Sequence, residues 1–394
     1  MTSSHDERYD TAVAQRPAPR VAIVHDYLTQ RGGAERVVLS MSRALPDAPI
    51  YTTLYNPDTT YPEFRQRQII TSPLNRIWAL RRDHRMALPL LPWAASRLTP
   101  DADVVLTSSS GWAHGARTNA PTIVYCHAPA RWVYQSEVYL GGPMLRSPIG
   151  WALALMRPGL RRWDRRAARS ADVYLANSRV VQARIEDAYA RNAEVLAPPH
   201  TVATDGPLEP ITAVSGWADE GYALVVSRLL PYKNVQQVIR AMRGRADRLL
   251  IVGDGPLWAS LRANAPDNVR LVRELTDAQM RWAYTNARLL VAPSHEDFGL
   301  TPLEAAAFGV PTVALRAGGY LDTIDEEVNG IFFSRPTPAD IAMALDRAAE
   351  RAWDREAIMD HAEYFNEARF HERLHQIVAQ QASSSSRRGD LGHV

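Results

Sequence analysis

The sequence predicts an α/β protein built from two Rossmann-like domains of similar size that face each other across a cleft. Three observations support this fold class. In both halves of the chain, short apolar runs typical of buried parallel strands alternate with helical stretches. A segment rich in proline, glycine, threonine and serine, residues 206–219, separates the halves as a linker. With 394 residues, each half is long enough to bury its own core.

Composition limits the classes of function. A net charge of +2 at pH 7 argues against nucleic acid as a partner. Cys126 is the one cysteine, which excludes an internal disulfide and suits the reducing cytoplasm. No uninterrupted apolar run reaches the length of a membrane span, about 18 residues. Residues 1–18 are polar, so we expect a disordered leader and no signal peptide. We therefore expect a cytoplasmic protein.

The first domain is expected to cover residues 19–205. Its first strand, within residues 20–27, leads into a helix through Gly32 and Gly33. Free N–H groups at a helix start suit an anion, although two glycines are also common in an ordinary turn. His127 follows another strand directly, at the carboxyl end where open α/β sheets bind ligands. Further strands are expected at residues 49–54, 104–110, 121–126 and 171–178.

Two arginine-rich helical stretches of this domain, residues 76–97 and 157–169, lie among tryptophan, leucine and methionine side chains. Such a surface suits peripheral contact with an anionic membrane or a lipid-linked acceptor, and a solvated arginine face over a packed helix is the alternative. Asp101 and Asp103 form a DXD pattern, but they precede a strand and therefore lie at the amino edge of the sheet, away from the ligand side. We predict no metal site there.

The second domain is expected to span residues 220–362. Its first strand delivers Arg228 and then Lys233 to a helix start. Lys233 is the one lysine among 45 lysine and arginine residues, which favours a site that needs a compact charge over chance survival. Two cations here would form charge-assisted hydrogen bonds to a diphosphate. Gly253 and Gly255, in the turn after the next strand, allow close approach of a nucleotide.

The stretch at residues 291–311, VAPSHEDFGLTPLEAAAFGVP, combines a strand, an acidic loop and a helix. Pro302 and Gly309 mark the first turn and the end of that helix. Glu296 lies in the loop and Glu304 in the first turns, so both carboxylates can face one crevice. The alternative is an acidic turn that only complements the helix dipole. The proline and glycine pattern favours a binding site.

These motifs resemble a known family. EDFGLTPLEAAAFG is similar to the EX7E motif of retaining GT-B glycosyltransferases of family four, and the SRL and lysine of residues 227–233 resemble the family's SRL…K motif. CHAPARWVY at residues 126–134 is similar to a segment of bacterial O-antigen and exopolysaccharide mannosyltransferases. The resemblance covers about residues 20–380. It implies the GT-B fold, with a helix at residues 363–381 that crosses back to the first domain. The serine-rich tail, residues 382–394, is expected to be disordered.

The resemblance also implies a function, namely a retaining hexosyltransferase that needs neither metal nor cofactor, because Arg228 and Lys233 take the metal's place. The donor would be a nucleotide sugar, GDP-mannose before a UDP-sugar, and the acceptor a glycan or a lipid-linked molecule in cell-surface polysaccharide or glycolipid synthesis. The leaving phosphate would assist deprotonation of an acceptor that attacks from the same face. Arg273 stands where family members usually have glycine in the loop that contacts the base, so the resemblance does not determine which nucleotide the donor carries. Asp322 replaces the glutamate of a GGxxE turn and can still cap a helix.

The resemblance also assigns roles to the residues of this sequence that match the family's motifs. Glu304 would bind the ribose, Glu296 would orient the donor sugar, and His127 would contact the transferred sugar. Gly33 and Gly32 would approach the donor from the first domain. The rest of the expected donor site is Phe298, Gly299, Leu300, Gly253 and Gly255. Two alternatives stay open: a nucleotide-sugar epimerase with the same fold, and a protein that binds a nucleotide sugar without catalysis.

Overall fold

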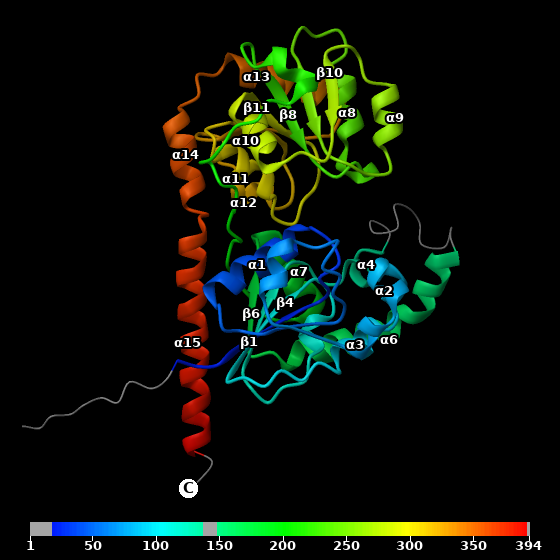
Figure 1. The fold of residues 1–394 in the computed structure, drawn as a ribbon, viewed down its shortest axis with the longest axis vertical. Helices are drawn as coiled ribbons and strands as arrows, with labels where there is room; N and C mark the ends of the chain where they lie inside the picture. Colours follow the sequence, from blue (N-terminus) through cyan, green and yellow to red (C-terminus); the bar gives the residue numbers. More distant parts are fainter. Residues whose placement is uncertain (1–17, 137–147, 392–394) are drawn as a thin grey trace, which may run out of the picture.

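A computed structural model describes residues 18–136 and 148–391. Residues 1–17, nearly the whole of the expected leader, lie outside the described residues. The chain forms two α/β domains, and the long helix α15 (Glu367–Leu391) runs along one side of the first (Figure 1). Among the described residues, no helix is both long enough and apolar enough to cross a membrane. The two-domain α/β fold predicted from the sequence is confirmed.

The first domain contains a seven-stranded parallel sheet in the order β3-β2-β1-β4-β5-β6-β7. Its strands are β1 (Val21–His25), β2 (Ile50–Thr52), β3 (Ile69–Thr71), β4 (Val104–Ser109), β5 (Thr122–Cys126), β6 (Val173–Ala176) and β7 (Glu194–Val195). Its α-helices are α1 (Gly33–Ala44), α2 (Trp78–Arg82), α3 (Leu91–Ala95), α4 (Arg131–Tyr134), α6 (Pro148–Ser170) and α7 (Arg179–Tyr189). Helices cover both faces of the sheet, which explains why the central strands β1, β4, β5 and β6 are mostly apolar.

Residues 76–97, expected to be helical, form short pieces, and Pro89 interrupts the stretch between η3 and α3. These pieces are the 3-10 helices η2 (Pro73–Arg76) and η3 (His84–Ala87) together with α2 and α3. Two further 3-10 helices of this domain are η1 (Pro62–Gln66) and η4 (Ala113–Gly115). Helices α2 and α3 lie on the side of the domain away from α15 (Figure 1).

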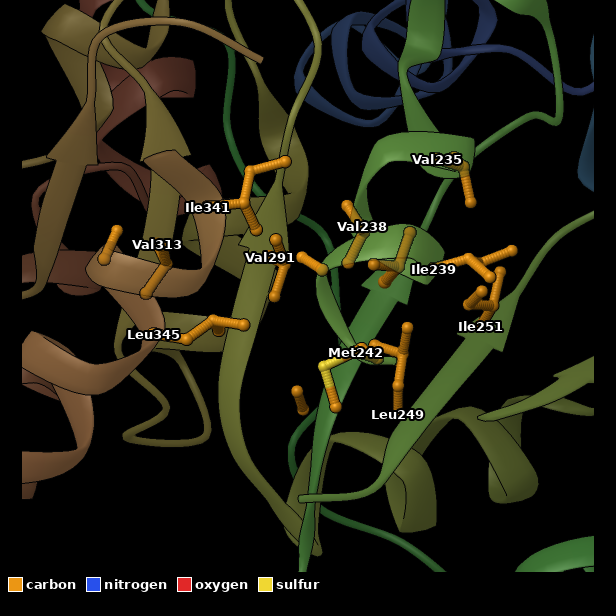
Figure 2. Packing of buried hydrophobic residues seen from close by; sticks show 14 of the residues in the cluster. Val235, Val238, Ile239, Met242, Leu249, Ile251, Val291, Val313, Ile341 and Leu345 are labelled. Carbon is orange, nitrogen blue, oxygen red and sulfur yellow. The ribbon is translucent and has the colours of Figure 1, made fainter. Parts of the chain in front are cut away.

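The second domain contains a six-stranded parallel sheet in the order β10-β9-β8-β11-β12-β13. Its strands are β8 (Tyr222–Val226), β9 (Leu249–Val252), β10 (Val269–Val272), β11 (Ala287–Ala292), β12 (Thr312–Leu315) and β13 (Gly330–Phe333). Its helices are η7 (Pro231–Lys233), α8 (Val235–Ala241), α9 (Trp258–Ala263), α10 (Asp277–Thr285), α11 (Leu300–Ala306), α12 (Tyr320–Thr323), α13 (Pro338–Glu350) and α14 (Arg355–Glu363). Figure 2 shows one side of the core, where Val238 and Ile239 of α8 lie with Ile251 of β9 and Val291 of β11.

The segment expected to be a linker, residues 206–219, is only partly one. The 3-10 helix η6 (Thr212–Trp217) forms within it, and Ile211 and Val214 are buried in the core of the second domain. Because the apolar residues of this segment are few and widely spaced, its composition did not indicate that Ile211 and Val214 pack in a core. The part of the linker that packs in neither hydrophobic core is therefore shorter than the expected residues 206–219.

The carboxyl-terminal helix is broken in two and is longer than predicted. Helix α14 packs on the second domain through Ile358 and Ala362, and α15 packs on the first domain through Phe370 and Leu374. The crossing back to the first domain is therefore confirmed. The prediction of a disordered tail from residue 382 is wrong as far as Leu391, because α15 continues through the serines. The Ser383 hydroxyl donates to the Ala379 carbonyl four residues earlier, at 2.9 Å, which is compatible with a helix.

Candidate active site

The topology of each sheet places the candidate residues together. In both sheets the strand order reverses direction at one point, between β1 and β4 in the first and between β8 and β11 in the second. Ligands of open α/β sheets bind beyond the carboxyl ends of the strands at such a point. His25 ends β1 and His127 follows β5, while Lys233 follows β8 and Glu296 follows β11. Sequence-distant residues are thus gathered at two facing edges.

Lys233 and Glu296 form an ion pair at the edge of the second domain. The Lys233 ammonium donates to Oε1 of Glu296, and the Ser294 hydroxyl donates to the same oxygen at 2.5 Å. Lys233 is only 9% exposed. Asn234, which follows it in a left-handed conformation, donates from its amide to the Pro293 carbonyl at 3.0 Å. The loops after β8 and β11 are therefore tied together around one carboxylate.

Glycines let a neighbouring turn pack against the acidic loop. Gly319 donates its backbone N–H to the Glu296 carbonyl at 2.9 Å. A Cβ atom at Gly318 or Gly319 would clash with the backbone of residues 296–298, and Gly299 has a φ of +90°. Phe298 is buried, and Leu300 begins α11. The loop that carries Glu296 is therefore held in one conformation.

Glu304, on α11, is already bonded. Arg36 of α1, in the first domain, donates to Oε1 at 2.6 Å, and the Tyr284 hydroxyl donates to Oε2 at 2.8 Å. Burial opposes the charge of Arg36, but Glu304 outweighs it and the Arg36 pKa is raised. Burial and the adjacent carboxylate raise the Tyr284 pKa. Glu304 thus forms part of the contact between the domains.

Asp297, which the sequence analysis did not single out, connects the domains more extensively. Arg131 and Arg184 of the first domain both pair with its carboxylate, Arg184 at 2.5 Å. The Ser178 hydroxyl donates to its backbone carbonyl, also at 2.5 Å. Burial alone would raise the Asp297 pKa, but the two arginines lower it below its usual value. Its position beside Glu296 was the one signal in the sequence, and its partners are more than a hundred residues away.

Asp322 contacts the start of a helix of the opposite domain. Its carboxylate accepts the backbone N–H of Arg179, the first residue of α7, at 2.9 Å, and the Arg179 side chain at 2.9 Å. Asp322 lies within α12 and does not cap that helix; it instead adds an acceptor at the start of α7, a first-domain helix whose N-cap is Ser178. Burial raises the Asp322 pKa, and Arg179 offsets this only in part.

The first-domain edge is formed by buried hydrogen bonds. His127 Nε2 lies 2.8 Å from the Ser108 hydroxyl, and His25 Nδ1 lies 3.1 Å from that hydroxyl. Burial, followed by repulsion from His25, lowers the pKa of His127 from 6.5 to about 3. Asp26 accepts the backbone N–H groups of Trp112 and Ala113 at 2.8 and 2.7 Å. The sequence analysis found His127 but missed His25, Asp26 and Ser108, which polar strand ends signalled only weakly.

Gly33 and Gly32 differ in their surroundings. A Cβ atom at Gly33 would have Leu300 of the second domain as its nearest neighbour at 3.8 Å, so this position faces the other domain. A Cβ atom at Gly32 would clash with the carboxylate of Glu35. Glu35 is buried, and burial raises its pKa. Gly33 is thus placed opposite the acidic motif, whereas Gly32 makes room for a side chain of its own domain.

Gly253 and Gly255 pack against protein backbone. A Cβ atom at Gly253 would clash with the Ser227 carbonyl, and one at Gly255 would lie 2.6 Å from the Leu229 carbonyl. Both glycines therefore support the loop that carries Arg228, whose side chain is exposed at the carboxyl end of β8. Of the predicted cations, Lys233 is bonded within the site, while Arg228 lies at its rim.

Asp101 and Asp103 lie at the opposite edge of the first sheet, as expected. Asp103 precedes β4 and pairs with Arg20 at 3.1 Å, and Asp101 lies 3.5 Å from the same guanidinium. Both carboxylates therefore neutralise an arginine ahead of β1, far from the carboxyl edge. The described residues contain no group of three or more histidine, cysteine, aspartate or glutamate side chains that could hold a metal ion.

Comparison with known families agrees with this geometry. Residues 31–199 match the family model described as Glycosyltransferase Family 4, and residues 210–365 match the one described as Glycosyl transferases group 1. Together the two matches span both domains. The chain is a GT-B glycosyltransferase of family four.

Two curated relatives and one solved structure place this glycosyltransferase further. A GDP-mannose-dependent alpha-mannosyltransferase of Corynebacterium glutamicum is 37% identical over 128 residues, which is 31% of this chain and only 30% of that protein. Human alpha-1,3/1,6-mannosyltransferase ALG2 is 24% identical over 84% of this chain and 87% of its own. The structure of Anabaena HepE in complex with UDP superimposes with a TM-score of 0.65 at 16% identity, covering 92% of this chain and 100% of that one. This last likeness shows the fold alone.

Proposed function

We propose that this glycosyltransferase transfers a hexose with retention of configuration, with mannose from GDP-mannose as the best candidate. The observation that carries the proposal is the Lys233–Glu296 pair at the carboxyl edge of the second sheet. The one lysine of the chain is buried against the first carboxylate of the EX7E motif. The two mannosyltransferase relatives favour mannose, whereas HepE binds UDP. GDP-mannose and UDP-sugars are therefore both to be tested.

Lys233 and Arg228 are assigned to the diphosphate. Lys233 would exchange part of its contact with Glu296 for a phosphate oxygen, and Arg228 at the rim would close on the second phosphate. Preorganised positive charge stabilises the leaving diphosphate as negative charge develops, so no metal is required in this proposal. Glu304 would bind the ribose through lone pairs that Arg36 and Tyr284 leave free.

Glu296 is assigned to the hydroxyl groups of the donor sugar. Its Oε1 already accepts from Lys233 and Ser294, which fixes the carboxylate as a hydrogen-bond acceptor. A double displacement would need a carboxylate directly beneath the anomeric carbon. We favour same-face attack, in which the leaving phosphate takes the proton of the acceptor. His127, across the cleft, contacts the transferred sugar, and the acceptor is a glycan or a lipid-linked molecule.

A donor screen followed by a transfer assay tests the proposal. Thermal shifts with GDP- and UDP-sugars identify the donor, and lipid extract supplies acceptors. NMR of the product reports the anomeric configuration, and added EDTA tests the need for a metal. Turnover of the donor without an acceptor would favour the nucleotide-sugar epimerase. Binding of the donor without any transfer would favour the protein that binds a nucleotide sugar without catalysis. An inverted product would overturn retention.

Two variants test the residue assignments. Glu296→Gln is expected to reduce transfer by about 100-fold while nucleotide affinity changes little, because it acts on the sugar. Glu220→Gln, at an exposed surface position, is the matched control. Arg228→Ala is expected to weaken nucleotide binding about tenfold, the effect of one charge-assisted hydrogen bond. Unchanged affinity in that variant would remove Arg228 from the site.

A further inference from the structure

Large apolar side chains that remain exposed are concentrated on one side of the first domain. Among the described residues, seven of the thirteen such side chains come from two stretches, residues 77–93 and 151–155. Trp78 is 62% exposed, Trp151 is 61% exposed and Leu155 is 85% exposed. The seven are Ile77, Trp78, Met86, Leu90, Trp93, Trp151 and Leu155. A grouping of this kind marks an interaction surface, whereas scattered apolar residues do not.

The two stretches belong to one surface. Leu80 of α2, Leu91 of α3 and Leu153 of α6 are buried in the same hydrophobic cluster, so the exposed residues beside them border the same part of the domain. Figure 1 shows α2, α3 and α6 together on the side away from α15. Residues of this side also reach the carboxyl edge of the first sheet, where the Thr29 hydroxyl lies 3.0 Å from His84 Nδ1.

The exposed face of α6 changes from apolar to basic along the helix. Trp151 and Leu155 are exposed in its first half, and Arg162, Arg166 and Arg169 are exposed in its second half. Their spacing of three, four or seven residues places them on one stripe of the helix. The stripe contains no acidic residue, because Asp164 is buried.

The other arginines of α6 contact the domain, so fewer side chains of residues 157–169 are available to a membrane than the sequence suggested. Arg157 donates to the Val133 carbonyl at 2.7 Å, and Arg165 donates to the Ala188 carbonyl at 2.9 Å. Arg161 lies over the Tyr134 ring. Half of this arginine-rich stretch is therefore structural, and the other half is free to meet a partner.

Two exposed tryptophans are each paired with an arginine four residues later. The Arg82 guanidinium lies 5.3 Å from the Trp78 ring centre, and that of Arg97 lies 5.4 Å from the Trp93 ring centre. An amphipathic ring beside a guanidinium suits the boundary between lipid headgroups and acyl chains. Between residues 76 and 97, Asp83 is the one acidic residue.

We propose that this tryptophan–arginine surface, made of the seven apolar residues with Arg82, Arg97, Arg162, Arg166 and Arg169, docks on an anionic lipid bilayer. Charge complementarity selects this partner, since the surface is almost free of acidic groups. The core of a protein interface is depleted of charge, whereas here arginines are interleaved with the exposed rings. The proposal does not depend on which sugar is transferred. It places the enzyme where a lipid-linked acceptor would be found.

Vesicle cosedimentation of the full chain tests this surface. We expect binding to vesicles of phosphatidylcholine mixed with phosphatidylglycerol, little binding to phosphatidylcholine alone, and weakening with added salt. Arg82→Gln combined with Arg97→Gln is expected to weaken binding about 30-fold, since each basic residue contributes about fivefold. Trp78→Ser combined with Trp93→Ser should also abolish most of the binding to anionic vesicles.

Met343→Ser combined with Met359→Ser, exposed apolar residues of the second domain, is the matched control and should bind as the unaltered chain does. Thermal unfolding verifies that each variant folds. Equal binding to neutral vesicles, or binding that survives both surface variants, would overturn the proposal. A dimer that dissociates on Trp78→Ser would also overturn it and assign the surface to a second copy of the chain.

The hydrogen-bonding role of His127 is set by a separate chain of three side chains. His25 Nδ1 lies 3.1 Å from the Ser108 backbone carbonyl, which can only accept, so Nδ1 must carry a proton. The same nitrogen lies 3.1 Å from the Ser108 hydroxyl. With that proton shared between the carbonyl and the hydroxyl oxygen, the hydroxyl accepts from His25 and has its own proton to donate to His127 Nε2 at 2.8 Å.

We infer that Ser108 and His25 are positioning residues that keep His127 as the neutral tautomer with its proton on Nδ1. In the described residues, Nε2 is the ring nitrogen of His127 with a hydrogen-bond partner, which leaves the Nδ1–H free to donate to a hydroxyl of the substrate. Burial, which disfavours the charged ring, agrees with a neutral histidine. The inference rests on the proposed function for the identity of the substrate but not for the tautomer.

Nitrogen NMR of the histidine rings tests the tautomer without any activity assay. We expect the Nδ1–H form of His127 in the unaltered chain, a mixture of tautomers in Ser108→Ala and recovery in Ser108→Thr, which restores a hydroxyl. Observation of the Nε2–H form in the unaltered chain would overturn the inference. With an active donor in hand, Ser108→Ala should lower kcat more than it changes the donor KM. A protein that shows the expected tautomer but no transfer would instead contradict the proposed function.

Discussion

The two edges that form the site differ in chemistry and in how the chain builds them. The second-domain edge is charged and comes from two loops, in which Lys233 pairs with Glu296 and the glycines at 318 and 319 support the acidic loop. The first-domain edge is buried and comes from the ends of separate strands, where His127 and His25 share the Ser108 hydroxyl and backbone N–H groups bond the Asp26 carboxylate.

This difference suits the two parts of a nucleotide sugar. A diphosphate needs positive charge, which a lysine and an arginine on flexible stems can deliver. Sugar hydroxyls need oriented neutral donors and acceptors, because a buried charge would carry a large desolvation cost. We therefore expect that substitutions on the second-domain edge act through charge, and that those on the first-domain edge act through hydrogen-bond geometry. The predictions below measure that division.

The largest effect is expected at Lys233. Lys233→Ala leaves the Glu296 carboxylate without its cation, and loss of one partner of a buried ion pair costs about 3–5 kcal/mol. Since Glu296 is partly exposed, we expect about 2–3 kcal/mol of lost unfolding free energy, together with a loss of nucleotide affinity. Chemical denaturation and calorimetric titration with the nucleotide measure the two quantities.

Lys233→Met combined with Glu296→Gln separates stability from binding. Removal of both charges should restore most of the unfolding free energy, because no unpaired charge is left, while nucleotide affinity stays low. Arg240→Ala, an exposed cation of α8, is the matched control. If the double variant binds nucleotide as tightly as the unaltered chain, Lys233 has only a structural role.

A smaller effect is expected at Asp297, which pairs with Arg131 and Arg184 between the domains. Asp297→Asn should cost about 2 kcal/mol, below the range for a fully buried pair because Arg131 is 41% exposed. The domains should also separate more readily, which small-angle X-ray scattering would detect as a larger radius of gyration. Asp346→Asn, whose partner Arg245 lies in the same domain, is the control and should leave the radius unchanged.

The lowered pKa of His127, on the first-domain edge, predicts that the unfolding free energy depends on pH. The folded pKa of about 3 lies below the unfolded value of 6.5, so the unfolded state binds the proton first. Stability from this group is complete above pH 6.5 and falls as the pH decreases toward 3. Between pH 7.5 and 5.5 the loss is about 1.4 kcal/mol. Denaturation of the unaltered chain and of His127→Gln at both pH values isolates this term, and equal slopes would contradict it.

The same division explains what the sequence could predict. Glu296, Glu304 and Lys233 lie in contiguous motifs, and strand–loop–helix order places such motifs at a carboxyl edge. His25 is the last residue of β1 and Ser108 the next to last of β4, and only the pairing of the two strands brings them together. The helical tail beyond residue 382 was missed because composition does not reveal that a helix anchored by Phe370 and Leu374 continues past its last packed turn.

The smallest effect is expected at Asp322. Its substitution measures how much of the free energy of an interdomain contact comes from the ion pair. Its partner Arg179 is 79% exposed, so the ion pair itself should contribute less than about 1 kcal/mol. Asp322→Asn keeps an oxygen that can accept the Arg179 backbone N–H, and burial already disfavours the carboxylate charge, as its raised pKa indicates. Asp322→Ala also removes the acceptor of the Arg179 backbone N–H, although Ser178 still caps α7, and should cost about 1 kcal/mol more. Denaturation of the two variants therefore separates this hydrogen bond from the charge. Equal losses in both would mean that the charge carries the contact, and Asp322 would then resemble Asp297 despite its exposed partner.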